Sequence, residues 1–394
     1  MSLSVSKRMA AIKPSPTGAV LALAAELRAA GRDIISLGAG EPDFDTPQHI
    51  KDAAHKAIKD GQTKYTPIDG TAELKAAIQQ KFLRENQLEY TASQIIVSSG
   101  AKQCLFNLCM GLLSPGDEAI IPAPYWVSYP DMVKLAGAEP VIVESGIDAD
   151  FKITPEQLAS SISDRTRLFI LNSPSNPTGA SYSAAELQAL GAILSDHPDI
   201  VIVADDIYEH IHWGDDPFCS FAAACPDLYD RVVTTNGVSK AYAMTGWRIG
   251  YAAGPAELIT AMKTVQSQST SNPCSISQVA AVAALSGDQS CVKQMTAAYK
   301  ERHDYVVHAL NSIDGFECRP GEGTFYALPR IVGALDRMHL AADTDFVTAL
   351  INDADVACVP GSAFGAPGYI RLSFACSMEM LEEATNRMKR VVSA

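Results

Sequence analysis

The stretch SKAYAMTGWRIGY, residues 239–251, places two cations, Lys240 and Arg248, among apolar and small residues. Most lysines are solvated surface charges, so a functional interpretation of these two cations needs evidence from the rest of the sequence. A partly desolvated lysine near other cations loses its proton more readily than a free side chain, whose pKa is about 10.4. Such an amine can form a Schiff base, and Arg248 could bind a phosphate through two hydrogen bonds.

Other polar residues follow apolar, strand-like runs. Asp205 ends the run IVIVA, with Tyr208 three residues later. A buried carboxylate is costly unless it is paired, and either a cationic ring nitrogen or a structural arginine would balance it. Asn176 lies in the Pro- and Gly-rich turn SNPTG, where its amide could donate a hydrogen bond. Arg371, in YIRLSFA, either pairs within the protein or binds a carboxylate from solvent.

Two further features suit a planar, anionic ligand. Gly100, Ala101 and Lys102 separate a strand-like run from a predicted helix, and a helix N-terminus presents free N–H groups to an anion. Trp126 follows the run AIIPAP and could form a flat wall, although packing is the commoner role of such an aromatic. The glycine fingerprints of dinucleotide-binding and P-loop proteins are absent from the sequence.

The elements that must position these residues alternate along the chain. Short apolar runs alternate with helix-like segments, which predicts βαβ units, a mostly parallel sheet and a large three-layer α/β/α domain. Residues 289–394 mix short strands with helices and predict a smaller α+β domain. We expect a large domain at 46–288 and a small domain built from 1–45 and 289–394. The predicted strands of the large domain lie at 94–100, 117–124, 167–174, 199–206 and 231–237.

Composition narrows the classes of partner. The net charge of −14 argues against nucleic acid or an anionic membrane as the main partner. Nine cysteines without metal-type spacing indicate reduced thiols, which is typical of the cytoplasm. We find no apolar stretch of the roughly 18 residues needed to span a bilayer. His210 and His212 alone make a poor metal site, so we expect no metal.

The ordered motifs resemble those of a known family, the class I aminotransferases of the aspartate aminotransferase type with fold type I. They run from GAGEPDFDTP and TKYTP through PYWVSYP, NSPSNPTG and DDIYEH to SKAYAMTGWRIGYAAGP and IRLSFA. The resemblance covers nearly the whole chain and is greatest to the bacterial 1β subgroup. It implies a homodimer that shares its active sites and uses pyridoxal 5'-phosphate, a cofactor for which the residues above are suited.

The resemblance also implies roles for individual residues. Lys240 would be the Schiff-base lysine and proton shuttle, Asp205 the partner of the pyridine nitrogen, Tyr208 and Asn176 the partners of the ring hydroxyl, and Trp126 the stacking aromatic. The implied phosphate contacts are Gly100, Ala101, Lys102, Ser239 and Arg248, with Tyr65 from a neighbouring subunit.

Substrate contacts are implied in the same way. The α-carboxylate would be bound by Arg371, Asn176 and the Gly40 backbone, and the distal carboxylate by Lys102 and Thr17, with Lys13 linked to prephenate use. The implied activity moves the amino group of L-aspartate to 2-oxoglutarate, with prephenate or glutamate as further substrates.

Three alternatives stay open at this stage. A C–S lyase or another amino-acid lyase could use the same fold. A ligand-sensing module without catalysis is disfavoured because every catalytic position is filled. An NAD-type dehydrogenase is disfavoured by the missing glycine fingerprint.

Overall fold

The computed structural model describes residues 5–12, 14 and 16–393. Its centre is a seven-stranded sheet in the order β2-β8-β7-β6-β5-β3-β4. Strands β3 to β7 are parallel to one another, and β8 is antiparallel to both of its neighbours. The prediction of a mostly parallel sheet is therefore confirmed. The strands span β2 Ile95–Ser98, β3 Glu118–Ala123, β4 Glu139–Glu144, β5 Thr166–Asn172, β6 Val201–Asp205, β7 Val232–Gly237 and β8 Gly250–Ala253.

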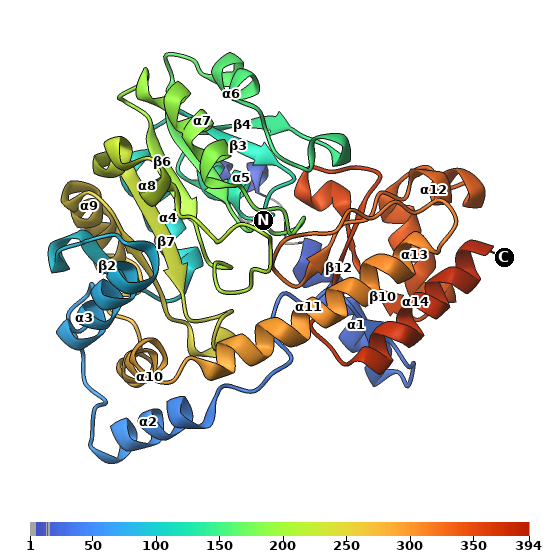
Figure 1. Ribbon diagram of the computed structural model, residues 1–394, viewed down its shortest axis with the longest axis horizontal. Coiled ribbons are helices and arrows are strands. Elements are labelled where there is room, and N and C mark those ends of the chain that lie inside the picture. The colour runs from blue at the N-terminus through green and yellow to red at the C-terminus, as the bar shows by residue number, and fades with distance from the viewer. Residues whose placement is uncertain (1–4, 13, 15, 394) are drawn as a thin grey trace.

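Helices cover both faces of this sheet, which gives the three expected layers (Figure 1). One face carries α4 (Ala101–Leu112), α5 (Tyr129–Leu135) and α9 (Ala256–Ser267), whose apolar residues form a core with the sheet. The opposite face carries a larger core. Its helices are α2 Gln48–Lys59, α3 Ala72–Lys81, α6 Pro155–Ser161, α7 Ala184–Ser195, α8 Phe221–Ala224 and α10 Ser275–Ser286.

Residues 16–36 and the C-terminal third of the chain form a smaller α+β region, on the right in Figure 1. Strand β1 (Ile35–Ser36) pairs in parallel with β10 (Val356–Ala357), so residues near the N-terminus lie against the C-terminal third. A three-stranded sheet joins β11 (Val359–Pro360), β12 (Ile370–Ser373) and β9 (Tyr326–Ala327). The helices are α1 Pro16–Ala29, α11 Ser290–Asn311, α12 Val332–Met338, α13 Asp343–Asp353 and α14 Met378–Ser393. No helix in the described part of the chain has the length and apolar character of a membrane span.

Two strands of the seven-stranded sheet escaped sequence analysis for identifiable reasons. Strand β4 lies at the sheet edge and is mostly half-buried or exposed, so it lacks a continuous apolar run. Strand β8 has the sequence GYAA, without a β-branched residue, although all four of its residues are buried. Tertiary packing rather than local propensity decides both assignments.

Strand β8 bears directly on the pocket described below, because it abuts the start of α4. A Cβ atom added at Gly250 would lie 2.0 Å from the backbone nitrogen of Ala101 and 2.6 Å from its Cα. Only glycine leaves room for the Gly100–Ala101 turn at this point.

We expect Gly250→Ala to lower the free energy of unfolding by about 2–3 kcal/mol, because a methyl group must displace backbone rather than a flexible side chain. Gly246→Ala is the matched control in the same segment, since its Cβ would meet nothing within 4 Å. It should change stability by less than about 0.5 kcal/mol. Urea unfolding measures both, and equal stabilities of the two variants would contradict the close approach.

Candidate active site

A cavity of about 440 Å³ opens at the carboxyl edge of the parallel strands, where the sheet meets the smaller region. Residues from both regions line it, including helix α1 and the segment after β1. Most of the residues singled out in the sequence come together here: Thr17, Gly40, Ala101, Lys102, Trp126, Asn176, Asp205, Tyr208, Ser239, Lys240, Arg248 and Arg371.

Lys240 follows β7 and points toward the segment after β1, where its Nζ donates to the carbonyl oxygen of Gly40. Burial, reinforced by the charges of Arg371 and Arg248, lowers the pKa of Lys240 to about 8. The charges of Glu41 and Asp205 act in the opposite direction. An amine with this pKa is partly neutral at physiological pH and can act as a nucleophile or proton carrier.

Asp205 ends β6 at the floor of the cavity and is 4% exposed. Its Oδ2 accepts a hydrogen bond of 2.6 Å from the Tyr129 hydroxyl, and its backbone carbonyl accepts one of 2.7 Å from Asn172. Burial raises the pKa of Asp205 to about 6, although the Tyr129 hydrogen bond favours the ionised form. A cationic group placed against this carboxylate would stabilise its charge.

Aromatic rings form two of the cavity walls. The hydroxyl groups of Tyr208 and Tyr326 lie 2.9 Å apart and are buried. On another side, the Lys102 ammonium lies 4.8 Å from the centre of the Trp126 ring. Burial, and then the charge of Arg248, lowers the pKa of Lys102. The cavity therefore combines a flat aromatic wall with adjacent cations.

Arg371 is fully enclosed on β12, with 2% exposure. Its Nη1 donates to Asn176 Oδ1 at 3.0 Å and its Nη2 donates to the Gly38 carbonyl at 2.8 Å. Its guanidinium lies 4.4 Å from the centre of the Tyr326 ring. The buried Nε has no hydrogen-bond partner in the part of the chain that the structure describes, so the group is held in place without being neutralised.

A cradle of small residues and backbone lies beside Lys240. Gly100 has a φ of +93° and precedes α4, whose first N–H groups face this end of the cavity. A Cβ at Gly100 would lie 2.3 Å from a terminal nitrogen of Arg248. Among the described residues, Arg248 donates only to backbone carbonyls, those of Thr245 at 3.0 Å and Ser99 at 3.3 Å. These groups form a site for an anion such as a phosphate.

The cations of the cavity share one property. None of them forms an ion pair with a carboxylate within the described ranges: their partners are carbonyl oxygens, an amide oxygen and aromatic rings. The cavity has a cationic lining although the chain carries a net charge of −14. It is therefore suited to a ligand with several negative charges. The four cations are Lys102, Lys240, Arg248 and Arg371.

Three predicted residues are not among those that line the cavity. Gly100 lies next to it, directly before the lining residue Ala101. Tyr65 is 92% exposed, so its role as a contact to a neighbouring subunit stays a prediction. Lys13 lies outside the described residues. Sequence reasoning also missed residues that belong to the site. Tyr129 stands three residues after Trp126 in PYWVSYP and Tyr326 lies in GTFYALPR, but no spacing rule connects them to Asp205 and Tyr208.

Comparisons with known proteins agree with this geometry. Residues 32–388 match the family model described as aminotransferase class I and II. An aspartate/prephenate aminotransferase of Nitrosomonas europaea is 57% identical over 397 residues, covering 99% of this chain and 100% of that protein. The aspartate aminotransferase of Rhizobium meliloti is 50% identical, covering 97% of this chain and 94% of the relative.

Solved structures show the same fold. The crystal structure of the aspartate aminotransferase from Rhizobium meliloti superposes with a TM-score of 0.95 at 48% identity, covering 100% of this chain and 99% of that one. The Thermus thermophilus aspartate aminotransferase with maleate gives a TM-score of 0.93 at 43% identity, covering 99% of this chain and 100% of the other. The expected fold type I is thus confirmed, and the chain belongs to the class I and II aminotransferases.

Proposed function

We propose that this aminotransferase uses pyridoxal 5'-phosphate to move the amino group of L-aspartate to 2-oxoglutarate. The observation that carries the proposal is the cluster of cations without carboxylate partners around Lys240. A phosphorylated cofactor and a dicarboxylic substrate together supply the negative charges that this cluster lacks. The names of the relatives in Nitrosomonas and Rhizobium point the same way.

The residues present fit this cofactor. The Gly100 turn and Arg248 would hold its phosphate, Trp126 would cover one face of its ring, and Asp205 would face its ring nitrogen. When bound, the cofactor supplies an electron sink for the bond-breaking step at the substrate α-carbon. The other expected contacts are Ala101, Lys102, Ser239, Tyr208, Asn176 and the partner tyrosine Tyr65.

The protein's own groups would orient the substrate and move its protons. Arg371, held by Asn176 and Gly38, would bind the α-carboxylate through its planar donors. Lys102 and Thr17, which also line the cavity, would bind the distal carboxylate. The Lys240 amine, whose pKa is about 8, would take the proton from the substrate α-carbon and deliver it to the C4′ carbon of the cofactor. In the second half-reaction it would move a proton from C4′ to the α-carbon of the new amino acid.

A larger acceptor, prephenate, is favoured by one additional observation. Leu21 lies one turn after Thr17 on α1, lines the cavity and leaves 37% of its surface exposed. An apolar side chain at the rim of a cationic cavity can contact the uncharged ring of a cyclic dicarboxylate. The Nitrosomonas relative carries prephenate in its name.

We place the enzyme in the cytoplasm as a homodimer. All nine cysteines are free thiols, as a reducing compartment would maintain them. The exposed ring of Tyr65 lies on the segment between α2 and α3 and would be covered by the partner subunit, where it would complete the phosphate site.

The reaction class is tested by the fate of aspartate. We expect the protein to consume aspartate only when 2-oxoglutarate is present, with oxaloacetate and glutamate formed in equal amounts. Lys240→Ala should lower kcat by at least about 10³-fold because it removes the general base. The exposed Lys293→Ala is the control. If pyruvate or ammonia is released when no 2-oxo acid acceptor has been added, the protein is a lyase instead.

The Lys240 pKa is tested in protein stripped of cofactor. Because its amine is neutral above a pKa of about 8, the rate of borohydride-trappable attachment of pyridoxal 5'-phosphate should rise with pH and level off above about pH 8. Arg371→Leu removes a charge that lowers this pKa, so its plateau should begin at higher pH. A wild-type midpoint near that of a free lysine would contradict the proposed environment.

The role of Leu21 is tested by paired substitutions on α1. Leu21→Asn should lower kcat/KM for prephenate by about tenfold and leave that for 2-oxoglutarate within about twofold. Leu23→Asn changes a similarly exposed leucine that does not line the cavity, and it should alter neither value. Equal losses for both acceptors would show that Leu21 does not discriminate between them.

A further inference from the structure

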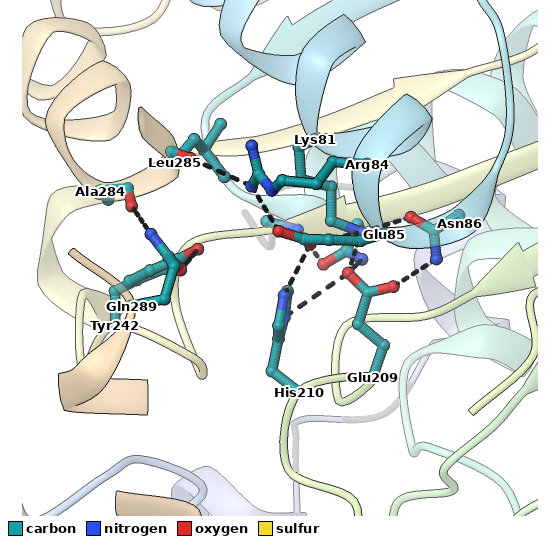
Figure 2. Close-up of polar contacts among 12 residues, drawn as sticks. Lys81, Arg84, Glu85, Asn86, Glu209, His210, Tyr242, Ala284, Leu285 and Gln289 are labelled. Carbon is teal, nitrogen blue, oxygen red and sulfur yellow. Dashed lines mark hydrogen bonds and ion pairs between the residues drawn. The ribbon is translucent and has the colours of Figure 1, made fainter. Parts of the chain in front are cut away.

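A polar cluster around Glu209, shown in Figure 2, is made of residues that are not among those lining the cavity. At its centre, the carboxylate of Glu209 forms an ion pair with Lys81, and both side chains are almost fully buried. Asn86 donates to Glu209 Oε2 at 2.8 Å and accepts a 2.7 Å hydrogen bond from Lys81. Burial would raise the pKa of Glu209, but Lys81 and His210 lower it overall. The carboxylate is therefore ionised and serves as an acceptor.

The other oxygen of this carboxylate reaches a different segment. Asn236, near the end of β7, donates from Nδ2 to Glu209 Oε1 at 2.8 Å. Its own Oδ1 accepts a 2.7 Å hydrogen bond from the backbone N–H of Gly237. Lys240 follows four residues after Asn236, and Tyr208 immediately precedes Glu209. One carboxylate thus joins the segments that carry two residues of the cavity.

A local distortion of the backbone brings the remaining members of the cluster to Glu209. Residues Phe82–Asn86 form a single π-helical turn, η2, directly after α3. The turn places Glu85 and Asn86 on the same side as Lys81, which lies at the end of α3. Such turns cost local stability and persist where side chains need a placement that a regular helix cannot provide. In this protein, Lys81 and the η2 residue Asn86 anchor Glu209 to the helical layer.

The cluster contains side-chain atoms that could coordinate a metal ion, but a lysine ammonium already balances the negative charge of its carboxylates. Glu85, Glu209 and His210 could each offer one ligand atom, which corrects the expectation that His210 lacks further ligands nearby. However, the Lys81 ammonium lies against Glu209 and 3.6 Å from Glu85, and a metal cation would have to displace it. His210 Nε2 is itself 3.0 Å from Glu85. Lys81 already supplies the buried positive charge, so the cluster is an internal ion-pair network.

We propose that Glu209 is a positioning residue, which sets the place of Lys240 by holding Asn236 against the anchored end of α3. This inference rests on the proposed function of Lys240. Lys81 and Asn86 hold the Glu209 carboxylate on the helical side, and its Oε1 also accepts the hydrogen bond from Asn236 on the side of the reacting lysine. Displacing a reacting group by about 1 Å can cost about 10²-fold in rate.

The two asparagines provide a matched pair of variants, because each donates one 2.8 Å hydrogen bond to the same carboxylate. We expect Asn236→Ala to lower kcat by about tenfold or more with KM within about threefold. The pH midpoint of the visible absorbance of the bound cofactor, which reports its linkage to Lys240, should move by about half a unit or more. Asn86→Ala should leave both quantities near their wild-type values because the Lys81 ion pair still holds Glu209, although both variants melt at lower temperatures.

The outcomes are separable. If Asn86→Ala and Asn236→Ala give the same kcat and the same absorbance midpoint, the cluster only stabilises the fold and the proposal is overturned. Asn236→Ser, which keeps a small polar group that is too short to reach Glu209, must reproduce the effect of alanine, and it replaces alanine in the comparison if that variant does not fold. A wild-type protein that binds no cofactor would refute the proposed function instead, and this is measured before any variant.

Discussion

Several positive charges held together without a carboxylate partner are the constraint on which the site depends. Lys240 and Arg371 are enclosed in one cavity, and among the described residues their direct contacts are carbonyl and amide oxygens and ring faces rather than paired carboxylates. Burial of unpaired charge is costly, and the protein bears this cost where its ligands bring the opposite charge. The same environment lowers the pKa of Lys240 to about 8, so the cost in stability is also the source of its reactivity.

The fold brings this charge together from distant parts of the chain. Gly38 and Gly40, after β1, accept hydrogen bonds from Arg371 and Lys240, so residues near the N-terminus complete a site whose lysine belongs to the central sheet. Helix α1 adds Thr17 and Leu21 to the same rim. Neither region has the site on its own. A movement of the smaller region relative to the sheet would change the distances within the site.

Hydrogen bonds from neighbouring side chains hold residues of the site in fixed positions. Asp205 is fixed by Tyr129 and Asn172, and Glu209 joins the next segment to β7. These hydrogen bonds are made by side chains that are themselves enclosed, so few rotamers are open to them. A catalytic group supported in this way can keep its geometry while its charge changes.

Local sequence determined much of this protein. Apolar runs that end in polar residues identify the buried strands and the sheet edge where Asp205 and Lys240 emerge, because burial on both faces leaves a pattern in the residue types. Tertiary structure alone decided which groups pair. The contacts of Tyr129 with Asp205 and of Lys81 with Glu209 join residues 76 and 128 positions apart, counted from their numbers. Periodicity reports the environment of a residue, whereas a hydrogen bond or ion pair depends on a distance that exists only once the chain has closed on itself.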